Sequence, residues 1–525
     1  MSRARVLIVA ALDIGTTNVK GEARVYVDGQ LDQRCASPSV SLGFSNGLVR
    51  IERFDAATRE VLHQIFAGVD IQAHLAASVR PRLAISQLGE AFFAVDAHGE
   101  VIGGALHTSQ SALGRRVMTD PGGYDLARLQ EETARHSGVP ATDEMTSIML
   151  LDWLREEPDL EDRMAYVASA GGYLICRLTG ERATTMSVLG REGVADMHAS
   201  DVSHRVLELC GFRSSWFPRV VSCGQPVAMI QAAEAERMGL PPSLVLYPQN
   251  HDQCVAYEGA TALTGLDFGV RTILTGTANG ICAPSRGSMT GEVVRAITER
   301  GYCFYPGLRK QDRVSLSYHL DGEPEESLMQ RLAAGRSRTD AYEVLDQLVY
   351  ESYIVRGEPI ESTYIPCRLM SFPVNRFPRG RSFSESFRLL PSRSGPLSDR
   401  SRLRDSLAGK ILFVRAGYEA HCRLLEETPQ DRLIAYGGGH SKSIVEFQMY
   451  ADILGKEIQV ISGETGIKGS MLTTVTEEER AGILPSVQNE AVMSSYRPDP
   501  GRAAEFERIF PHFLEHLVDL YPHVA

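Results

Sequence analysis

The first residues of the chain alternate between apolar and polar positions in a way that predicts a β-rich start. Residues 5–12 form a continuous apolar run, which is typical of a buried strand. After the stretch DIGTT, apolar and polar residues alternate over positions 18–27, which is the periodicity of a half-buried strand. Asp28 and Gly29 then form a dipeptide typical of hairpin turns. The pattern therefore predicts a strand, a tight turn, a strand, a turn and a further strand.

Helical and extended patterns follow one another over the rest of the first half. Apolar residues at helical spacing predict a helix within residues 55–78. Two apolar runs, at 82–87 and 91–96, predict strands separated by Leu88-Gly89-Glu90. Residues 146–179 have the pattern of helices. This mixture predicts an α/β protein.

The opening pattern is repeated later in the chain. Residues 270–284, VRTILTGTANGICAP, are an apolar strand, a Gly-Thr turn and a second apolar strand. Two such units about 260 residues apart indicate a duplication, or at least two domains built alike. The clearest α/β unit lies at 431–462, where an apolar strand enters a glycine-rich turn, a helix ends at Gly455 and another strand follows.

The length and composition of the chain agree with two globular domains. A chain of 525 residues is too long for one core, and 43% hydrophobic with 23% charged residues is ordinary for a globular protein. We predict domains at residues 1–260 and 261–485 and a helical C-terminal extension at 486–525. A stretch rich in Arg, Ser and Pro at 375–406 is expected to be a surface loop.

Charge and cysteine content restrict the partners and the compartment. The formal net charge of −12 argues against binding to nucleic acid or to an anionic membrane surface. The nine cysteines contain no C-x-x-C pair, which fits a reducing compartment better than a disulfide framework or a zinc site. No stretch resembles a signal peptide or approaches the roughly 20 apolar residues of a membrane span. We expect a soluble cytoplasmic protein with a small-molecule partner.

Three glycine-containing turns are candidates for binding phosphate. In DIGTT, the amides and hydroxyls of Thr16 and Thr17 can donate to phosphate oxygens, and Asp13 can hold Mg²⁺ through water. TGTAN, residues 275–279, offers the same donors, and YGGGHSKS, residues 436–443, lets a nucleotide lie against the backbone near a helix N-terminus. Taken alone, each stretch is weak evidence, because a plain turn is the alternative interpretation. Neither the Walker A pattern nor G-x-G-x-x-G occurs, which excludes a P-loop or Rossmann site.

The tetrapeptide Asn-His-Asp-Gln at residues 250–253 places polar groups inside an apolar stretch. The apolar residues 244–246 precede it, and Val255 and Ala256 follow it. A carboxylic acid and an imidazole at the end of an apolar strand either cap a turn or contact a ligand. The residues alone leave both interpretations open.

In this order, and over nearly the whole chain, these motifs resemble those of the FGGY carbohydrate kinase family in the actin/hexokinase/Hsp70 ATPase superfamily. LDIGTTNVK and LTGTANGI resemble the two phosphate motifs, and NHDQCVAYEGA resembles the segment of the catalytic base. The most specific match is YGGGHSKSIVEFQMYADILGKEIQV, which resembles the family's G-G-G-x-K-S…Q-x-x-A-D-x-L-G signature. The resemblance implies two actin-like (ribonuclease H-like) ATPase domains around a central nucleotide and substrate cleft.

The resemblance also implies an activity, namely ATP-dependent phosphorylation of a ketose or polyol hydroxyl with Mg²⁺. Asp252 matches the general base, which accepts the hydroxyl proton as the phosphoryl group transfers. The residues expected to contact the sugar are Gln87, Glu90, His107, His251, Asp252 and Gln253. The residues expected to bind Mg-ATP are Asp13 (to Mg²⁺, through water), Gly15, Thr16, Thr17, Lys20, Gly276, Thr277, Gly437, Gly438, Gly439 and Ser441. A homodimer is a further family-level expectation.

The match is weakest among the expected sugar contacts. The usual His-Gly after Gln87 becomes Leu88-Gly89, and the usual W-x-D-x-R becomes HTSQS at residues 107–111. These departures favour a ketose or polyol other than xylulose or glycerol. Glu90 and His107 either contact sugar hydroxyls or are ordinary loop residues, and Lys20 either neutralises phosphate or is an exposed strand lysine. Two other classes stay open, a kinase-like ATPase switch and a sugar-binding regulator with little turnover.

Overall fold

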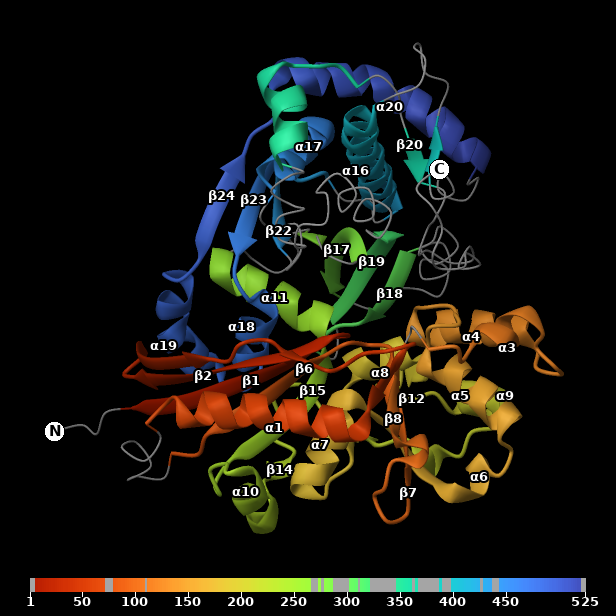
Figure 1. The fold of residues 1–525 in the computed structure, drawn as a ribbon, viewed down its shortest axis with the longest axis vertical. Helices are drawn as coiled ribbons and strands as arrows, with labels where there is room; N and C mark the ends of the chain where they lie inside the picture. The colour runs from red at the N-terminus through yellow and green to blue at the C-terminus, as the bar shows by residue number, and fades with distance from the viewer. Residues whose placement is uncertain are drawn as a thin grey trace.

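The chain forms two seven-stranded sheets with helices packed against them (Figure 1). The computed structural model describes residues 5–70, 79–108, 111–265, 272–274, 278–286, 302–309, 312–321, 346–360, 364–366, 387–389, 398–424, 428–436 and 443–520. All strands of the first sheet come before residue 252, and all strands of the second sheet come after residue 271.

The first sheet has the strand order β14-β15-β6-β1-β2-β3, with β4 paired to β2. Strands β1, β6 and β15 are parallel, whereas β2 and β3 continue the sheet in antiparallel fashion. The predicted opening of three strands and the predicted strand at 82–87 are therefore confirmed. The strand bounds are β1 (Val6–Ile14), β2 (Asn18–Val27), β3 (Gln30–Ala36), β4 (Val40–Ser41), β6 (Arg82–Gln87), β14 (Ala228–Met229) and β15 (Val245–His251).

The second sheet, of order β18-β19-β17-β16-β22-β23-β24, repeats the architecture of the first. Its core β19-β17-β16-β22-β23 has the same succession of strand directions as β3-β2-β1-β6-β15. The two sheets are thus built alike, as the repeated sequence pattern predicted. The strands are β16 (Thr272–Leu274), β17 (Ala278–Arg286), β18 (Tyr302–Pro306), β19 (Asp312–Asp321), β22 (Arg432–Tyr436), β23 (Glu457–Ser462) and β24 (Val492–Tyr496).

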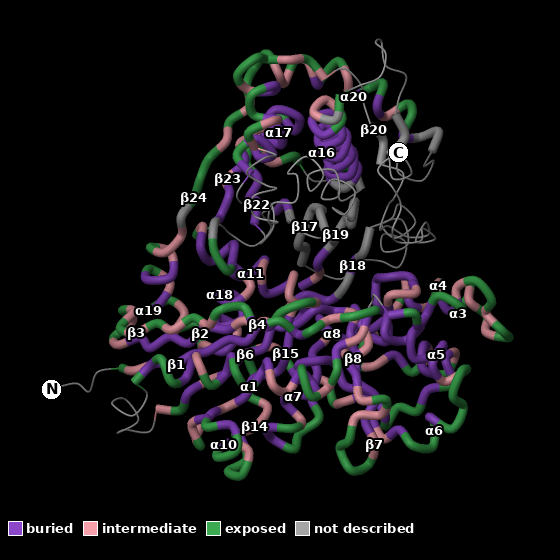
Figure 2. Tube along the Cα trace, in the orientation of Figure 1, coloured by how far each residue is buried: buried purple, intermediate pink, exposed green. Residues whose placement is uncertain are grey.

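Helices cover both faces of the first sheet, so its central strands are buried on both sides (Figure 2). Helices α1 (Ile51–Ala67) and α7 (Ala170–Thr179) pack on one face, with α10 (Ala232–Met238) against α7. Helix α18 (Thr465–Leu472) packs on β1 and β6 from the other face, together with α11 (Asp252–Thr264). The predicted helix within 55–78 corresponds to α1, which begins a few residues earlier.

A smaller sheet of order β5-β8-β7-β9 and several short helices complete the first half. The expectation of helices throughout 146–179 was wrong over Met164–Ser169, which form strand β9 on β7. A short apolar run fits a strand or a helix equally well, and pairing with β7 decides it here. The elements are β5 (Leu48–Arg50), β7 (Ala91–Asp96), β8 (Ala105–Thr108), α3 (Arg115–Thr119), α4 (Leu126–Ser137), α5 (Thr146–Glu156), α6 (Leu160–Arg163), α8 (Met186–Glu192) and α9 (His204–Cys210).

In the second half, helices α16 (Asp399–Leu424), α17 (Ile444–Leu454) and α20 (Pro500–Leu520) share one hydrophobic core with the second sheet. The expectation of a surface loop at 375–406 was wrong from residue 399 on, because these residues begin α16 and bury Leu403 and Arg404 completely. Except for β21 (Phe387–Leu389), the rest of that stretch lies outside the described residues or directly before α16. The predicted C-terminal helix is α20, whereas residues 492–496 form β24.

Two helices from opposite halves of the chain, α11 and α18, cross at a pair of glycines. A Cβ added to Gly469 of α18 would overlap the carbonyl oxygen of Val255 on α11. A Cβ added to Gly259 of α11 would likewise overlap the carbonyl oxygen of Thr465 on α18. The two backbones therefore touch, and this contact fixes the position of α11.

Ion pairs join the segment after β23 to the first sheet. Arg24 on β2 is completely buried, and its guanidinium donates to both carboxylate oxygens of Glu490 at 2.6 and 2.7 Å. Arg82 on β6 binds Glu479 of α19 (Glu477–Gln488) at 2.7 Å. The alternation along β2 predicted a half-buried strand, but Glu22 and Arg24 are buried because this segment covers them.

Candidate active site

The carboxyl ends of β1, β6 and β15 lie side by side and bring three predicted segments together. In the strand register, Asp13 is opposite Ser86 and Gln87 is opposite His251. Asp252 follows His251 directly, as the first residue of α11. Ligands of parallel α/β sheets bind at this end of the strands. The register thus places the DIGTT turn, the SQ segment (Ser86 and Gln87) and the NHDQ segment (residues 250–253) at one edge of the first sheet.

The turn between β1 and β2 presents its polar groups toward this edge. The Gly15 amide donates to the Asn18 carbonyl oxygen at 2.9 Å, which closes the turn. Thr16 is half-buried and Thr17 is exposed. The Thr17 hydroxyl accepts a hydrogen bond from the Asn18 side chain at 3.0 Å. The turn therefore has the shape and the exposed hydroxyl that a phosphate-binding turn requires.

Lys20 lies next to Asp13 and forms ion pairs with carboxylates from both halves of the chain. Its ammonium is 3.5 Å from the Asp13 carboxylate and 2.5 Å from Glu464, the residue that precedes α18. Burial alone would lower the pKa of Lys20, but the two carboxylates outweigh it and raise the pKa. Burial also raises the pKa of Asp13, against the opposing effect of Lys20. Lys20 is thus a charged lysine at the turn rather than a free surface lysine, and Glu464 is a partner that sequence reasoning missed.

Asp252 stands at the start of α11, where the helix dipole favours a carboxylate. One oxygen accepts a hydrogen bond from the Gln253 amide at 2.6 Å, and 42% of the side chain stays exposed. Although this part of the side chain reaches solvent, the partial burial of the carboxyl group, together with the nearby charge of Asp13, raises the pKa of Asp252 to about 7. The two interpretations left open by the sequence are therefore compatible, because the residue begins a helix and also faces solvent.

His251 is buried beside Asp252, with its Nε2 at 3.2 Å from an Asp252 oxygen. Burial and the positive charge of Arg191 lower the pKa of His251 well below its ordinary value. The imidazole is therefore neutral at physiological pH. Gln253 is half-buried at the first turn of the same helix.

Glu90 lies in the turn between β6 and β7, and its carboxylate forms an ion pair with Arg191 of α8. Both side chains are mostly buried, at 16% and 8% exposure. Sequence reasoning selected Glu90 but missed Arg191, which is about a hundred residues further along the chain. No local signal in the sequence marks Arg191.

Two other predicted sugar contacts have structural partners in this conformation. Gln87 is completely buried, and its side-chain oxygen accepts from the Gly171 amide at 2.6 Å, which holds the start of α7. The His107 ring packs against Phe92 and Trp153, with ring centroids 5.4 and 4.5 Å away. Burial lowers the pKa of His107 to about 4. Both side chains are therefore packed by neighbouring groups in this conformation, and their contact with a sugar stays a prediction.

The other predicted nucleotide contacts, Gly276, Thr277, Gly437, Gly438, Gly439 and Ser441, lie outside the described residues. The strands before these turns, β16 and β22, are adjacent and parallel. Asp346 caps the start of α17 and accepts from the Ser443 hydroxyl at 2.7 Å. Asp346 thus caps the N-terminus of α17, the helix N-terminus near which the sequence predicted a bound nucleotide.

The described residues contain no group of three or more His, Cys, Asp or Glu side chains arranged to hold a metal ion. Asp13 offers a carboxylate beside the turn, with 18% of its side chain exposed. One carboxylate fits Mg²⁺, which keeps several of its waters and takes further oxygen ligands from phosphates.

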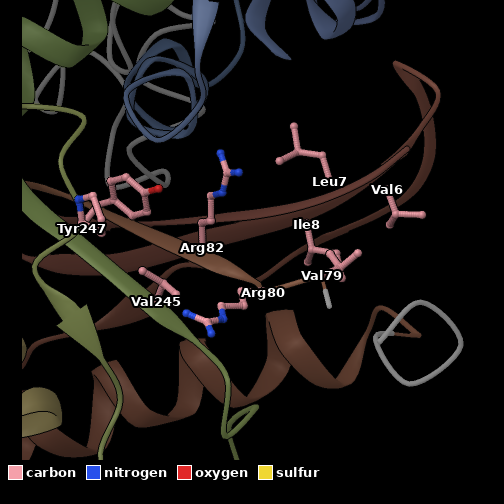
Figure 3. Close-up of a pocket in the computed structure, with 9 residues that line it drawn as sticks. Val6, Leu7, Ile8, Val79, Arg80, Arg82, Val245 and Tyr247 are labelled. Carbon is pink, nitrogen blue, oxygen red and sulfur yellow. The ribbon is translucent and has the colours of Figure 1, made fainter. Parts of the chain in front are cut away.

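A hollow of about 420 Å³ lies at the opposite end of the same strands (Figure 3). Its walls include Val6, Arg82 and Val245, which begin β1, β6 and β15. The Arg82 guanidinium is bound to Glu479 and to the Thr474 carbonyl oxygen. This hollow is therefore separate from the candidate active site.

Comparison with known proteins identifies the family. Residues 8–259 match the model of the N-terminal domain of the FGGY family of carbohydrate kinases. This range contains the phosphate turn, the SQ segment and Asp252. Residues 8–259 therefore have the sequence of an N-terminal domain of the FGGY family of carbohydrate kinases, as the motifs predicted.

Curated relatives include two bacterial L-fuculokinases. The chain is 32% identical to that of Salmonella typhi over 130 residues, which are 25% of this chain and 27% of the relative. It is 26% identical to that of Escherichia coli (strain K12) over 259 residues, which are 49% of this chain and 52% of the relative. The matches thus span about a quarter to a half of the relatives' length.

Solved structures with the same fold cover the whole chain. The xylulose kinase from Rhodospirillum rubrum superposes with a TM-score of 0.76 at 20% identity, over 99% of this chain and 100% of that one. Plasmodium falciparum glycerol kinase with ADP gives 0.75 at 11% identity, over 97% and 98%. These likenesses establish the α/β fold, which is the actin-like fold that the sequence motifs predicted. Among the described helices, none is long and apolar enough to cross a membrane.

Proposed function

We propose that this chain transfers the γ-phosphoryl group of ATP to a hydroxyl of a ketose or polyol, with Asp252 as the general base. The observation that carries the proposal is the position of Asp252, at the end of β15 and beside the strand end that bears Asp13. A carboxyl group with a pKa of about 7 is half ionised at neutral pH, so it can accept the hydroxyl proton and later release it. Membership of the FGGY family supports the same activity.

The remaining residues have binding and positioning roles in this proposal. Bound Mg²⁺ would neutralise phosphate charge, and Asp13 is the residue that would hold it. Thr16, Thr17 and Lys20 would donate to phosphate oxygens. Gly15, Gly276, Thr277, Gly437, Gly438, Gly439 and Ser441 complete the proposed nucleotide contacts.

On the sugar side, the proposed contacts come from the groups around the base. Neutral His251, Gln253 and Glu90 are polar and lie close to Asp252 or to its neighbours. Gln87 and His107 would contact the sugar only after a local rearrangement of their present hydrogen bond and ring contacts. L-Fuculose is the first substrate to test, because two curated relatives with similar sequences are named L-fuculokinases.

A coupled assay of ADP release tests the proposal directly. The purified chain is mixed with Mg-ATP and, in turn, with L-fuculose, xylulose, glycerol, gluconate and further ketoses and polyols. At least one ketose or polyol is expected to raise ADP release well above the basal rate. If ATP binds but no compound raises the rate, a kinase-like switch or a regulator becomes the better description.

The raised pKa of Asp252 predicts the pH dependence of catalysis. The general base must be ionised, so kcat/KM is expected to fall about tenfold per pH unit below pH 7 and to level off above it. His251 is not expected to titrate in this range, because its pKa is lowered. The measurement is kcat/KM for the sugar between pH 5 and about pH 9 at saturating Mg-ATP. A kcat/KM that stays level down to about pH 5 would show that Asp252 has an ordinary pKa.

The organisation of the protein beyond the site also remains a proposal. We infer a domain boundary near residue 260, a second domain to residue 485 and a C-terminal extension at 486–525. A cytoplasmic location and a homodimer fit the family and the composition.

A further inference from the structure

The ion pair between Glu90 and Arg191 lies in the part of the site assigned to the sugar. Glu90 comes from the turn after β6, and Arg191 comes from α8. With 8% of its side chain exposed, Arg191 is among the few mostly buried arginines of the described chain. A buried guanidinium with a carboxylate partner is costly to form and is kept where it has a role.

Close contacts connect this ion pair to the residues beside the base. A Cβ on Gly89 would lie 2.8 Å from the Arg191 Cβ and 2.9 Å from the His251 ring, so the Gly89 backbone separates the two side chains. Helix α8 is also tied to β15, because the His251 amide donates to the Ser187 hydroxyl at 3.2 Å. The charge of Arg191 acts on both His251 and Asp252. Arg191 is therefore within electrostatic reach of the reacting end of the site.

Carboxylates outnumber cations among the described residues of the site. Asp13, Asp252 and Glu90 carry negative charge, whereas Lys20 and Arg191 carry positive charge. Lys20 is already bound by Asp13 and Glu464. Arg191 is thus the cation nearest the proposed sugar contacts, and Glu90 is its partner.

We propose that the Glu90–Arg191 pair is a specificity element: by occupying the Arg191 guanidinium, Glu90 makes the site select uncharged sugars and reject sugar acids. The inference rests on the proposed sugar kinase activity. An arginine fork binds a carboxylate in two parallel hydrogen bonds, and a substrate carboxylate would compete with Glu90 for it. The Glu90 carboxylate would also repel the acid directly, which adds discrimination against the wrong substrate.

Replacing Glu90 with glutamine tests this role with little change in shape. The amide keeps the size of the side chain but removes its charge, and Arg191 then becomes available to a substrate carboxylate. The assay compares kcat/KM for gluconate with kcat/KM for the best neutral sugar. The Glu90→Gln variant is expected to shift this ratio toward gluconate by about tenfold or more, the usual size of one charge-assisted hydrogen bond.

Arg191→Met provides the complementary test. This variant leaves Glu90 without its cationic partner. The KM for the neutral sugar is therefore expected to rise, while the KM for ATP stays unchanged. The kcat/KM for gluconate is not expected to increase. Asp55→Asn and Arg177→Met are matched controls, because Asp55 and Arg177 form a partly buried ion pair on α1 and α7. These controls are expected to leave both the substrate ratio and the KM values as in the parent protein.

The outcomes separate this proposal from the proposed function. If the unmodified protein phosphorylates no sugar, the kinase proposal fails, and the specificity role fails with it. If the unmodified protein is a kinase and Glu90→Gln leaves the gluconate ratio unchanged, only the specificity role is overturned. Efficient phosphorylation of gluconate by the unmodified protein would also overturn only the specificity role. Thermal unfolding of each variant shows whether the fold is intact.

Discussion

Asp252→Asn is expected to abolish sugar-stimulated ADP release while ATP binding persists. Asparagine keeps the shape of the side chain at the start of α11 but cannot accept the hydroxyl proton. Loss of a general base typically lowers the rate by roughly 10²–10⁴-fold. The measurements are the coupled assay at saturating sugar and a nucleotide titration followed by calorimetry.

The control for this variant is Asp55→Asn, which removes a carboxylate on α1 from an ion pair with Arg177. It is expected to retain the activity of the parent protein. If Asp252→Asn also retained more than about a tenth of the activity, Asp252 would not be the base. Loss of ATP binding in Asp252→Asn would instead indicate that the residue supports the nucleotide site.

Gly469→Ala is expected to destabilise the whole protein, because the new methyl group would overlap the Val255 carbonyl oxygen on α11. The backbone of α11 cannot move aside as a flexible side chain can, so the new methyl group would push the two helices apart. We expect a loss of roughly 2–4 kcal/mol in the free energy of unfolding. The thermal midpoint should fall by about 2–4 °C for a chain of this length, as followed by circular dichroism.

Gly466 provides a control within the same helix. No atom lies within 4 Å of a Cβ added there, so Gly466→Ala should be neutral or stabilise the helix by up to about 1 kcal/mol. Equal midpoints for the two alanine variants would contradict a tight glycine crossing. Because Asp252 begins α11, Gly469→Ala should also lower activity more than Gly466→Ala does.

Sequence patterns predicted those elements of the fold in which local periodicity and burial agree. The β1-β2-β3 opening has the three strands that its apolar and polar pattern predicts, and the β22-α17-β23 unit has the predicted order of strand, helix and strand. Helix α11 was missed because it is buried on nearly every side, so its residues show little amphipathic pattern. The burial of Arg24 was missed for a similar reason, since its cover comes from Glu490, far along the chain.

Within the site, the sequence located the residues that belong to contiguous motifs. Asp13, the Thr16–Thr17 turn and Asp252 lie at neighbouring strand ends, as expected for a shared cleft. Arg191 and Glu464 could not be found, because each meets the site only through tertiary contacts with distant segments. His107 illustrates the reverse case, since its motif position gave no sign that Phe92 and Trp153 would enclose it.

The crossing of α11 and α18 bears on whether the two halves can exist separately. Helix α11, which begins with Asp252, belongs to the first half by sequence, but the helix that covers it, α18, is contributed by the second. A fragment ending at residue 260 would expose the Gly259 face of α11 to water and leave Arg24 without Glu490. We therefore expect that the first half does not fold stably without the second.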